Sequence, residues 1–204
     1  MTSIETSPLT PMFSFCLIDH DGRNVSDETY RGHYVLIFFG FTHCRVVCPR
    51  ALAKLSAVLD SLGPLADRMR PIYVTVDPER DTPDAMRLFL QSYPRFTGLT
   101  GSREQIDRAK NAFRVFAQRV DDPAGNGGYA VVHTAITYVM DPRGRFVSHF
   151  TDALSAEELA SRLRLLLESD NALRTDAEEI KPPMEPVSVE PPNGAVPTPS
   201  SPAT

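Results

Sequence analysis

Short runs of β-branched and aromatic residues alternate along the chain with longer segments in which leucine recurs at helical spacing. The runs are bounded by Gly, Pro or Asp, which is typical of strands buried on one or both faces. The last two runs are separated by DPRG, a turn composition, and therefore predict a hairpin. The predicted strands are residues 34–41, 71–77, 133–141 and 145–150.

The helices between these strands are indicated by their ends. Pro49 is predicted to be the first residue of one helix, because proline is tolerated there, and Gly63 with Pro64 terminates it. Leucine at helical spacing supplies its buried face, at Leu52, Leu55, Leu59 and Leu62. Further helices are predicted to start at Thr82, at Ser102 with Gln105, and at Ser155 with Glu158, the last two as capping boxes.

The order strand, helix, strand, helix, hairpin, helix predicts an α/β fold. It is the order of the thioredoxin-like fold, with extra elements inserted before the hairpin. We expect a single domain at residues 12–168, preceded by a lead-in at 1–11. Residues 169–204 are predicted to be a proline-rich disordered tail, since eight of the eighteen prolines follow residue 180 and large apolar residues are few. Such a tail could also serve as a docking peptide.

Composition excludes several classes of function. The chain has 204 residues and a formal net charge of −5, so nucleic acid and anionic membrane surfaces are not expected as partners. It shows neither an 18-residue apolar run nor a basic start followed by an apolar stretch. We therefore expect a soluble chain without a membrane span or an export address.

The three cysteines divide into one isolated residue and one pair. Cys16 lies in an alternating apolar stretch, and we expect it to be buried and inert. Cys44 and Cys48 are four positions apart after the first strand, where a metal clamp, a redox pair and two packed residues are all possible. With Pro49 at the first helical position, Cys48 would cap the helix, which should favour its thiolate, and Arg45 adds a positive charge.

Three sequence blocks, in order, resemble the Sco/SenC family: FFGFTHCRVVCPRAL at 38–52, VTVDPERDTP at 74–83 and HTAITYVMDPRG at 133–144. The resemblance runs from about Met12 to Leu167. It implies a thioredoxin-like fold and a copper site formed by Cys44, Cys48 and His133. Two thiolates and an imidazole also suit copper chemically, as Cu(I) or Cu(II), one ion per chain.

The family's role implies that this chain matures the binuclear copper centre of cytochrome c oxidase, as copper donor or as reductant of the recipient cysteines. Its partner would be the copper-centre subunit or another copper protein, and we expect a monomeric metallochaperone rather than an enzyme. The family is found in the periplasm or on the outer side of the inner membrane. A thiol-disulfide oxidoreductase or redox sensor is the alternative, and a thiol peroxidase is a third.

The residues next to Cys44 and next to His133 differ from those that family members carry at these positions. Members carry acidic residues after the first cysteine and before the histidine, where this chain has Arg45, Val46 and Val132. Arg45 should offset the charge of a dithiolate and lower a thiol pKa. Asp77 and its neighbours are interpreted mainly as part of a helix start, with a role beside the metal as the alternative, and His43 is not expected to be a ligand.

Overall fold

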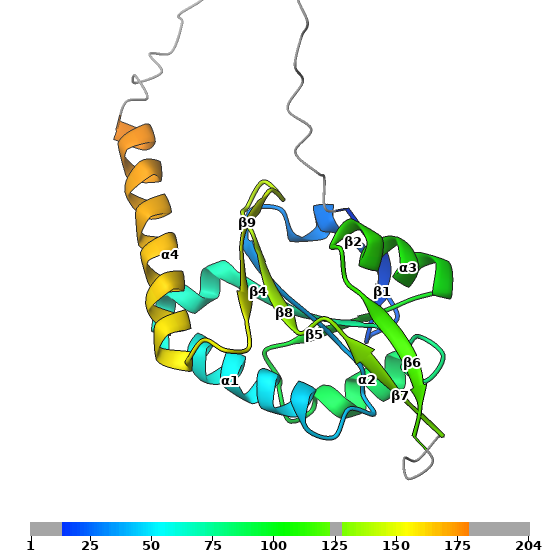
Figure 1. Cartoon of the computed structure of the whole chain (residues 1–204). Helices are drawn as coiled ribbons and strands as arrows, with labels where there is room; N and C mark the ends of the chain where they lie inside the picture. Colours follow the sequence, from blue (N-terminus) through cyan, green and yellow to red (C-terminus); the bar gives the residue numbers. More distant parts are fainter. Residues whose placement is uncertain (1–13, 123–127, 180–204) are drawn as a thin grey trace, which may run out of the picture. The chain divides into compact units, whose positions relative to one another are not determined.

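The computed structural model describes residues 14–122 and 128–179 (Figure 1). The chain divides into two compact units, Met1–Glu168 and Ser169–Thr204. Helix α4 (Ala156–Glu179) continues past the boundary predicted at residue 168, so residues 169–179, expected in the disordered tail, are helical. The predicted lead-in at 1–11 and the proline-rich residues 180–204 lie outside the described residues.

The first unit is built on a sheet of seven strands in the order β2-β1-β5-β4-β3-β8-β9. Strands β3, β4 and β5 run parallel, and β1, β8 and β9 extend the sheet by antiparallel pairing. The strands are β1 (Cys16–Asp19), β2 (Asn24–Ser26), β3 (Tyr34–Gly40), β4 (Met69–Thr75), β5 (Thr97–Thr100), β8 (Ile136–Met140) and β9 (Phe146–Thr151).

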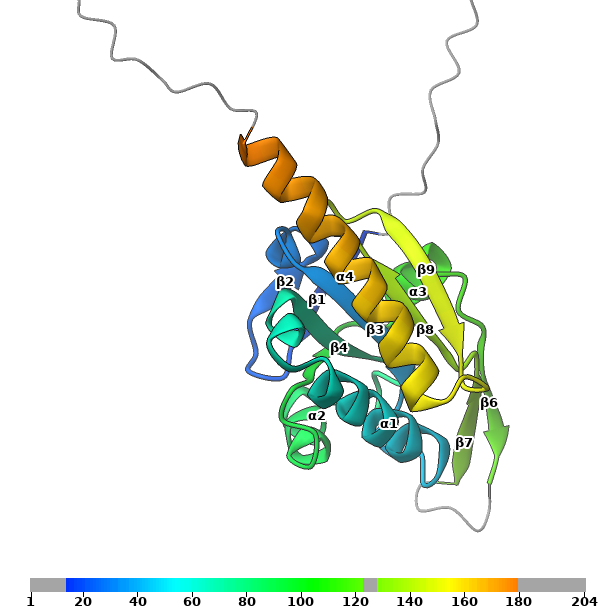
Figure 2. The same cartoon turned by 90° about the vertical axis from the view of Figure 1, so that its left-hand side faces the viewer.

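Helices cover both faces of this sheet. In Figure 2, α1 and the start of α4 lie in front of β3 and β8, and α3 lies behind them. The other helical segments are α1 (Val47–Ser61), α2 (Pro83–Leu90), α3 (Arg103–Ala112) and the short 3-10 helices η1 (Asp27–Tyr30) and η2 (Gly63–Arg68). The predicted thioredoxin-like arrangement is confirmed. Within the described residues, none of the helices is both long and apolar enough to cross a bilayer.

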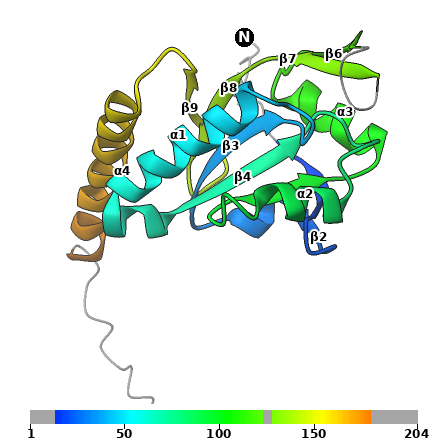
Figure 3. The same ribbon diagram turned by 90° about the horizontal axis from the view of Figure 1, so that it is seen from below.

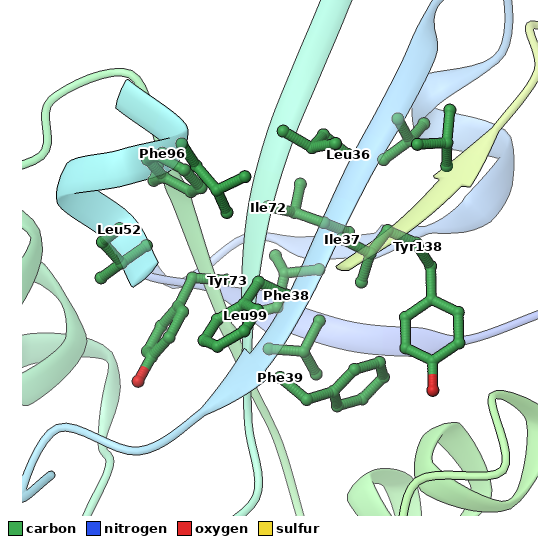
Figure 4. Close-up of a cluster of buried hydrophobic side chains, with 14 of the residues drawn as sticks. Leu36, Ile37, Phe38, Phe39, Leu52, Ile72, Tyr73, Phe96, Leu99 and Tyr138 are labelled. Carbon is green, nitrogen blue, oxygen red and sulfur yellow. The ribbon is translucent and has the colours of Figure 1, made fainter. Parts of the chain in front are cut away.

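The core lies on both sides of β3, whose seven residues are all buried. Figure 4 shows side chains of β3 packed against those of β4, α1 and β8. Such a strand needs helices on both faces, which explains its continuous apolar run rather than an alternating one. Its last residue, Gly40, leads directly into the loop that carries Cys44 and ends at α1, which carries Cys48.

A separate two-stranded sheet is inserted before the final hairpin. Strand β6 (Ala117–Asp121) pairs antiparallel with β7 (Tyr129–His133), and Figure 3 shows this hairpin set apart at one end of the molecule. The single strand predicted at 133–141 is therefore wrong in extent. Thr134 and Ala135 break it, so His133 ends β7 and the main sheet resumes at Ile136.

Cys16 is exposed, and its predicted burial is wrong. Phe15 and Leu17 are buried, and successive strand residues point to opposite faces, so the residue between them faces out. The alternation that suggested a buried stretch thus places Cys16 on its outer side.

Candidate metal centre

An open cleft of about 630 Å³ lies between the loop that follows β3 and strand β7. One wall is formed by residues 41–47, which contain Cys44, and the other by residues 129–133, which end at His133. Arg80 and Asp122 also line the cleft. Residues from three of the predicted sequence blocks therefore meet at one place in the fold.

Cys48 and His133 are brought into contact beside this cleft, which His133 lines. Cys48 is fully buried, and its Sγ lies 3.7 Å from His133 Nε2. The other ring nitrogen, Nδ1, lies 3.1 Å from the carbonyl oxygen of Thr134. An Nδ1–H that donates to this carbonyl leaves the Nε2 lone pair facing the sulfur. The histidine is thus oriented with a metal-binding atom toward Cys48.

Cys44 lies in the loop just before α1 and is half-buried. Its Sγ accepts a hydrogen bond from the backbone N–H of Cys48 at 3.3 Å. The helix begins at Val47 with Val46 at the cap position, so the prediction that Cys48 caps the helix is wrong. The unpaired N–H groups of the first turn point at Cys44, which takes the place of a capping side chain.

The thiolate is favoured at Cys44 and not at Cys48, where it was predicted. A hydrogen bond from the Cys48 side chain, followed by backbone N–H groups of the first turn and opposed by partial burial, lowers the pKa of Cys44 to about 5. The pKa of Cys48 is raised, first by the hydrogen bond to Cys44, then by burial and by the Cys44 charge.

We expect Cys44 to be alkylated with a pH midpoint near 5, because its lowered pKa leaves the reactive thiolate present above that pH. The rate should fall as pH falls through this value and stay level toward neutral pH. Replacing Cys48 by alanine removes the main hydrogen-bond donor and should raise the midpoint. The measurement is the rate of iodoacetamide labelling of the Cys44 peptide, followed by mass spectrometry; a midpoint between 8 and 9 in the unmodified chain would contradict the geometry.

The hydroxyl of Tyr73 is buried against the Cys48 sulfur. A hydrogen bond between the two side chains acts to lower the pKa of Cys48 and to raise that of Tyr73. A methyl group added at Gly40 would collide with this hydroxyl and would lie 2.8 Å from Cys48 Sγ. Burial, and then the neighbouring Cys48, raise the pKa of Tyr73 well above its usual value. The site therefore contains a protonated donor that is ready for an acceptor, and a buried thiolate at Cys48 would be one.

Asp81 fixes the loop that leads to Cys44. Its buried carboxylate accepts hydrogen bonds from the Thr42 N–H at 3.0 Å, the Thr42 hydroxyl at 2.6 Å and the Thr75 hydroxyl at 2.6 Å. Burial raises its pKa, and these hydrogen bonds act in the opposite direction. The sequence predicted the acids around Asp77 only as part of a helix start, because the partners of Asp81 lie 39 and 6 residues away.

Asp77 ties the hairpin that carries His133 to the main sheet. Its buried carboxylate accepts hydrogen bonds from the Tyr129 hydroxyl at 2.9 Å and from Arg80 Nε at 2.5 Å, and Arg119 lies 3.3 Å away. The guanidinium of Arg80 also lies over the Tyr129 ring, 3.7 Å from its centroid. These contacts join β4 to β6 and β7, which belong to a different sheet.

The remaining predicted residues lie at the rim of the cleft. His43 Nδ1 lies 3.0 Å from the Thr42 hydroxyl. Val46 and Val132 are 65% and 54% exposed, so two of the three departures from the family add apolar side chains to this rim, beside the charged Arg45. Within residues 14–122 and 128–179, no three His, Cys, Asp or Glu side chains already form a group that could hold a metal. Two of the predicted ligands are in contact, and Cys44 is turned toward the helix.

Comparisons with known proteins give one consistent likeness. The sequence model of the SCO1/SenC family matches residues 5–168. The SCO2-like protein RP587 of Rickettsia prowazekii is 36% identical over 146 residues, which cover 71% of this chain and 71% of that protein.

Solved structures extend the likeness to the fold. Bradyrhizobium japonicum ScoI with copper bound is 42% identical, has a TM-score of 0.68, and is matched over 74% of this chain and 96% of that one. BsSco, a member of the Sco family of cytochrome c oxidase assembly proteins with a disulfide switch, is 27% identical with a TM-score of 0.60. That match covers 82% of this chain and 97% of BsSco.

Proposed function

The chain belongs to the SCO1/SenC family, and from that premise we propose that it binds copper and takes part in assembling cytochrome c oxidase. Support comes from a relative with copper bound at 42% identity and from another in a family of cytochrome c oxidase assembly proteins. The recipient would be the copper-centre subunit of the oxidase or another copper protein, and the chain would act as a monomer that carries one copper.

Cys44, Cys48 and His133 are the ligands in this proposal. The observation that carries it is the 3.7 Å separation of Cys48 Sγ and His133 Nε2, next to an open cleft that Cys44 and His133 line. Donors that far apart can share one metal, because ligand distances of about 2.0–2.3 Å, as in zinc sites, give a similar spacing. Two sulfurs and an imidazole are donors that copper accepts, and a three-ligand site stays open for transfer.

Copper binding would change both cysteines. The Cys44 sulfur would turn from the first turn of α1 toward the metal, and Cys48 would lose its proton, since a thiolate is the metal-binding form. The Tyr73 hydroxyl, which already lies beside Cys48, could then donate to its thiolate. The buried donor thus fits a site whose second sulfur becomes anionic only when metal arrives.

The test of this function is a Cu(I) titration against a coloured chelator. We expect one Cu(I) per reduced chain, and His133→Ala should weaken binding by more than the ~10- to 100-fold typical of outer-shell partners. His149→Ala is the matched control, because that histidine is exposed and packs on Phe146 in β9. Equal affinity of the two variants would exclude His133 as a ligand.

A redox role of the same pair is the second candidate. An accessible cysteine of low pKa beside a buried one of high pKa is the arrangement of a thiol that attacks disulfides and a thiol that resolves them. BsSco has a disulfide switch. A reductase of this kind should keep its activity in His133→Ala, whereas a copper donor should lose transfer to the oxidase copper-centre domain.

A further inference from the structure

Strand β7 has one paired edge and one open edge. Within the described residues it pairs with β6 alone. The Gly128 carbonyl accepts from the Asp122 N–H, and the Thr134 N–H donates to the Phe116 carbonyl, so even-numbered residues point their polar groups toward β6.

Odd-numbered residues of β7 point their backbone groups the other way, because these groups alternate along an antiparallel strand. The Tyr129 carbonyl confirms this direction, since it accepts a hydrogen bond from Arg80 Nη1 at 3.0 Å rather than from β6. The N–H and C=O of Val131 therefore face away from the hairpin, without a partner strand among residues 14–122 and 128–179.

This open edge borders the cleft of the metal centre. Figure 2 shows β7 between β6 and the loop at the start of α1, and the cleft lies between residues 129–133 and residues 41–47. Its volume, about 630 Å³, falls in the range of about 300–1,000 Å³ typical of ligand sites. A short extended segment would fit there, whereas a flat protein face would not reach Cys48.

We propose that the open edge of β7 is the docking site for an extended, cysteine-bearing segment of the copper-accepting partner. The segment would add to the hairpin as a third strand, with backbone hydrogen bonds to Val131, and its cysteine would lie between Cys44 and His133. This inference rests on the proposed function and adds how the partner is recognised. Main-chain pairing supplies affinity, and the side-chain positions supply specificity.

The rim of the cleft indicates the side chains that such a segment would carry. Val46, just before α1, and Val132, in β7, both line the cleft and are 65% and 54% exposed. Exposed apolar side chains gathered at a functional site are typical of an interaction surface. Apolar residues next to the cysteine of the segment would cover them.

The probe is a seven-residue peptide with blocked ends, one central cysteine and valine or threonine elsewhere, supplied as its mixed disulfide with thionitrobenzoate. The Cys44 thiolate attacks the peptide sulfur, the Cys44–peptide bond forms as the original S–S bond breaks, and thionitrobenzoate leaves with the electron pair. Release of this coloured thiolate from the reduced full-length chain gives the rate.

Two N-methylated isomers of the peptide make the decisive comparison. One carries methyl groups on the residues next to the cysteine, the other on the residues two positions away, so each blocks one edge of an extended strand. We expect one isomer to react about tenfold more slowly than the other, the factor that one to two lost backbone hydrogen bonds produce. Equal rates would overturn the proposal.

Val131→Pro tests the protein's side of the contact. Proline removes an N–H that does not bond to β6, so the hairpin ladder should survive. Its ring also occupies the edge that a third strand would approach, so the two isomers should react at the same rate, whereas Val131→Ala, which shortens the same buried side chain, should keep the difference. A stable dimer with slow exchange of the Val131 amide would overturn the proposal in favour of a second copy.

Copper titration separates this proposal from the proposed function. Both Val131 variants should still take up one Cu(I) per chain. Failure of the unmodified chain to bind copper would count against the function alone, because the comparison of the two isomers needs no metal.

Discussion

Replacing Cys48 by serine is expected to lower Cu(I) affinity by well over a hundredfold. Cys48 is fully buried, and its sulfur is 3.7 Å from His133 Nε2, so it lies at the centre of the proposed ligand set. A hydroxyl is a harder donor than a thiolate and stays protonated near neutral pH, and Cu(I) selects soft sulfur. Mutation of a residue that only contacts a metal ligand typically lowers metal affinity by about 10- to 100-fold. The loss of a ligand itself should lower the affinity further.

The measurement is competition with a Cu(I) chelator, combined with thermal unfolding of the metal-free chain. Cys16→Ser is the matched control: Cys16 is exposed on β1, and its replacement should leave affinity unchanged. Cys48→Ser buries a hydroxyl in the core, so Tm should fall somewhat, and the affinities are compared at a temperature where both chains are folded. Retained tight binding in Cys48→Ser would show that copper is held elsewhere in the chain.

The parts of the fold that the sequence predicted are those encoded by neighbouring residues. Strand 34–41 was recognisable because β3 is buried on both faces and is apolar throughout. The starts of α2 and α3 were recognisable because Thr82, and Ser102 with Gln105, form caps within the first turn. Such signals need no knowledge of the rest of the fold.

The ionisation order of the cysteine pair could not be predicted in this way. The start of α1 has no side-chain cap, so Pro49 alone suggested the position of the first turn, and the actual start lies at Val47. That shift moves Cys48 into the helix, where it is buried, and gives the free N–H groups to Cys44. Burial against Tyr73 is a tertiary property that the spacing of two cysteines does not encode.

The β6–β7 hairpin, which carries His133, could not be predicted from the pattern of apolar residues either. Strand β6 is largely exposed, so it shows no apolar run, and it was expected only as extra elements before the last hairpin. What fixes the hairpin is Asp77, whose partner Tyr129 lies 52 residues away. The alternative reading of Asp77, a role beside the proposed metal site, accords with this contact, because the carboxylate supports the strand that ends at His133.

Asp77→Ala should therefore destabilise the chain and loosen the site together. Removing the carboxylate leaves Arg80 buried without its partner and the Tyr129 hydroxyl without an acceptor. Breaking a buried ion pair from one side typically costs about 3–5 kcal/mol. For a domain of this size that corresponds to a fall in Tm of roughly 6–20 °C.

The copper affinity of the same variant should fall by about 10- to 100-fold, as for partners that orient a ligand, because His133 loses the anchor of its strand. Asp60→Ala is the control: that carboxylate pairs with Arg95 at the surface, where an ion pair contributes about 1 kcal/mol or less. Asp77→Asn separates the two effects, since an amide oxygen can still accept from Tyr129 but cannot neutralise Arg80. If Asp77→Ala lost stability while its Cu(I) affinity stayed at the parent value, the hairpin would hold His133 in place without Asp77, and the carboxylate would serve the fold alone.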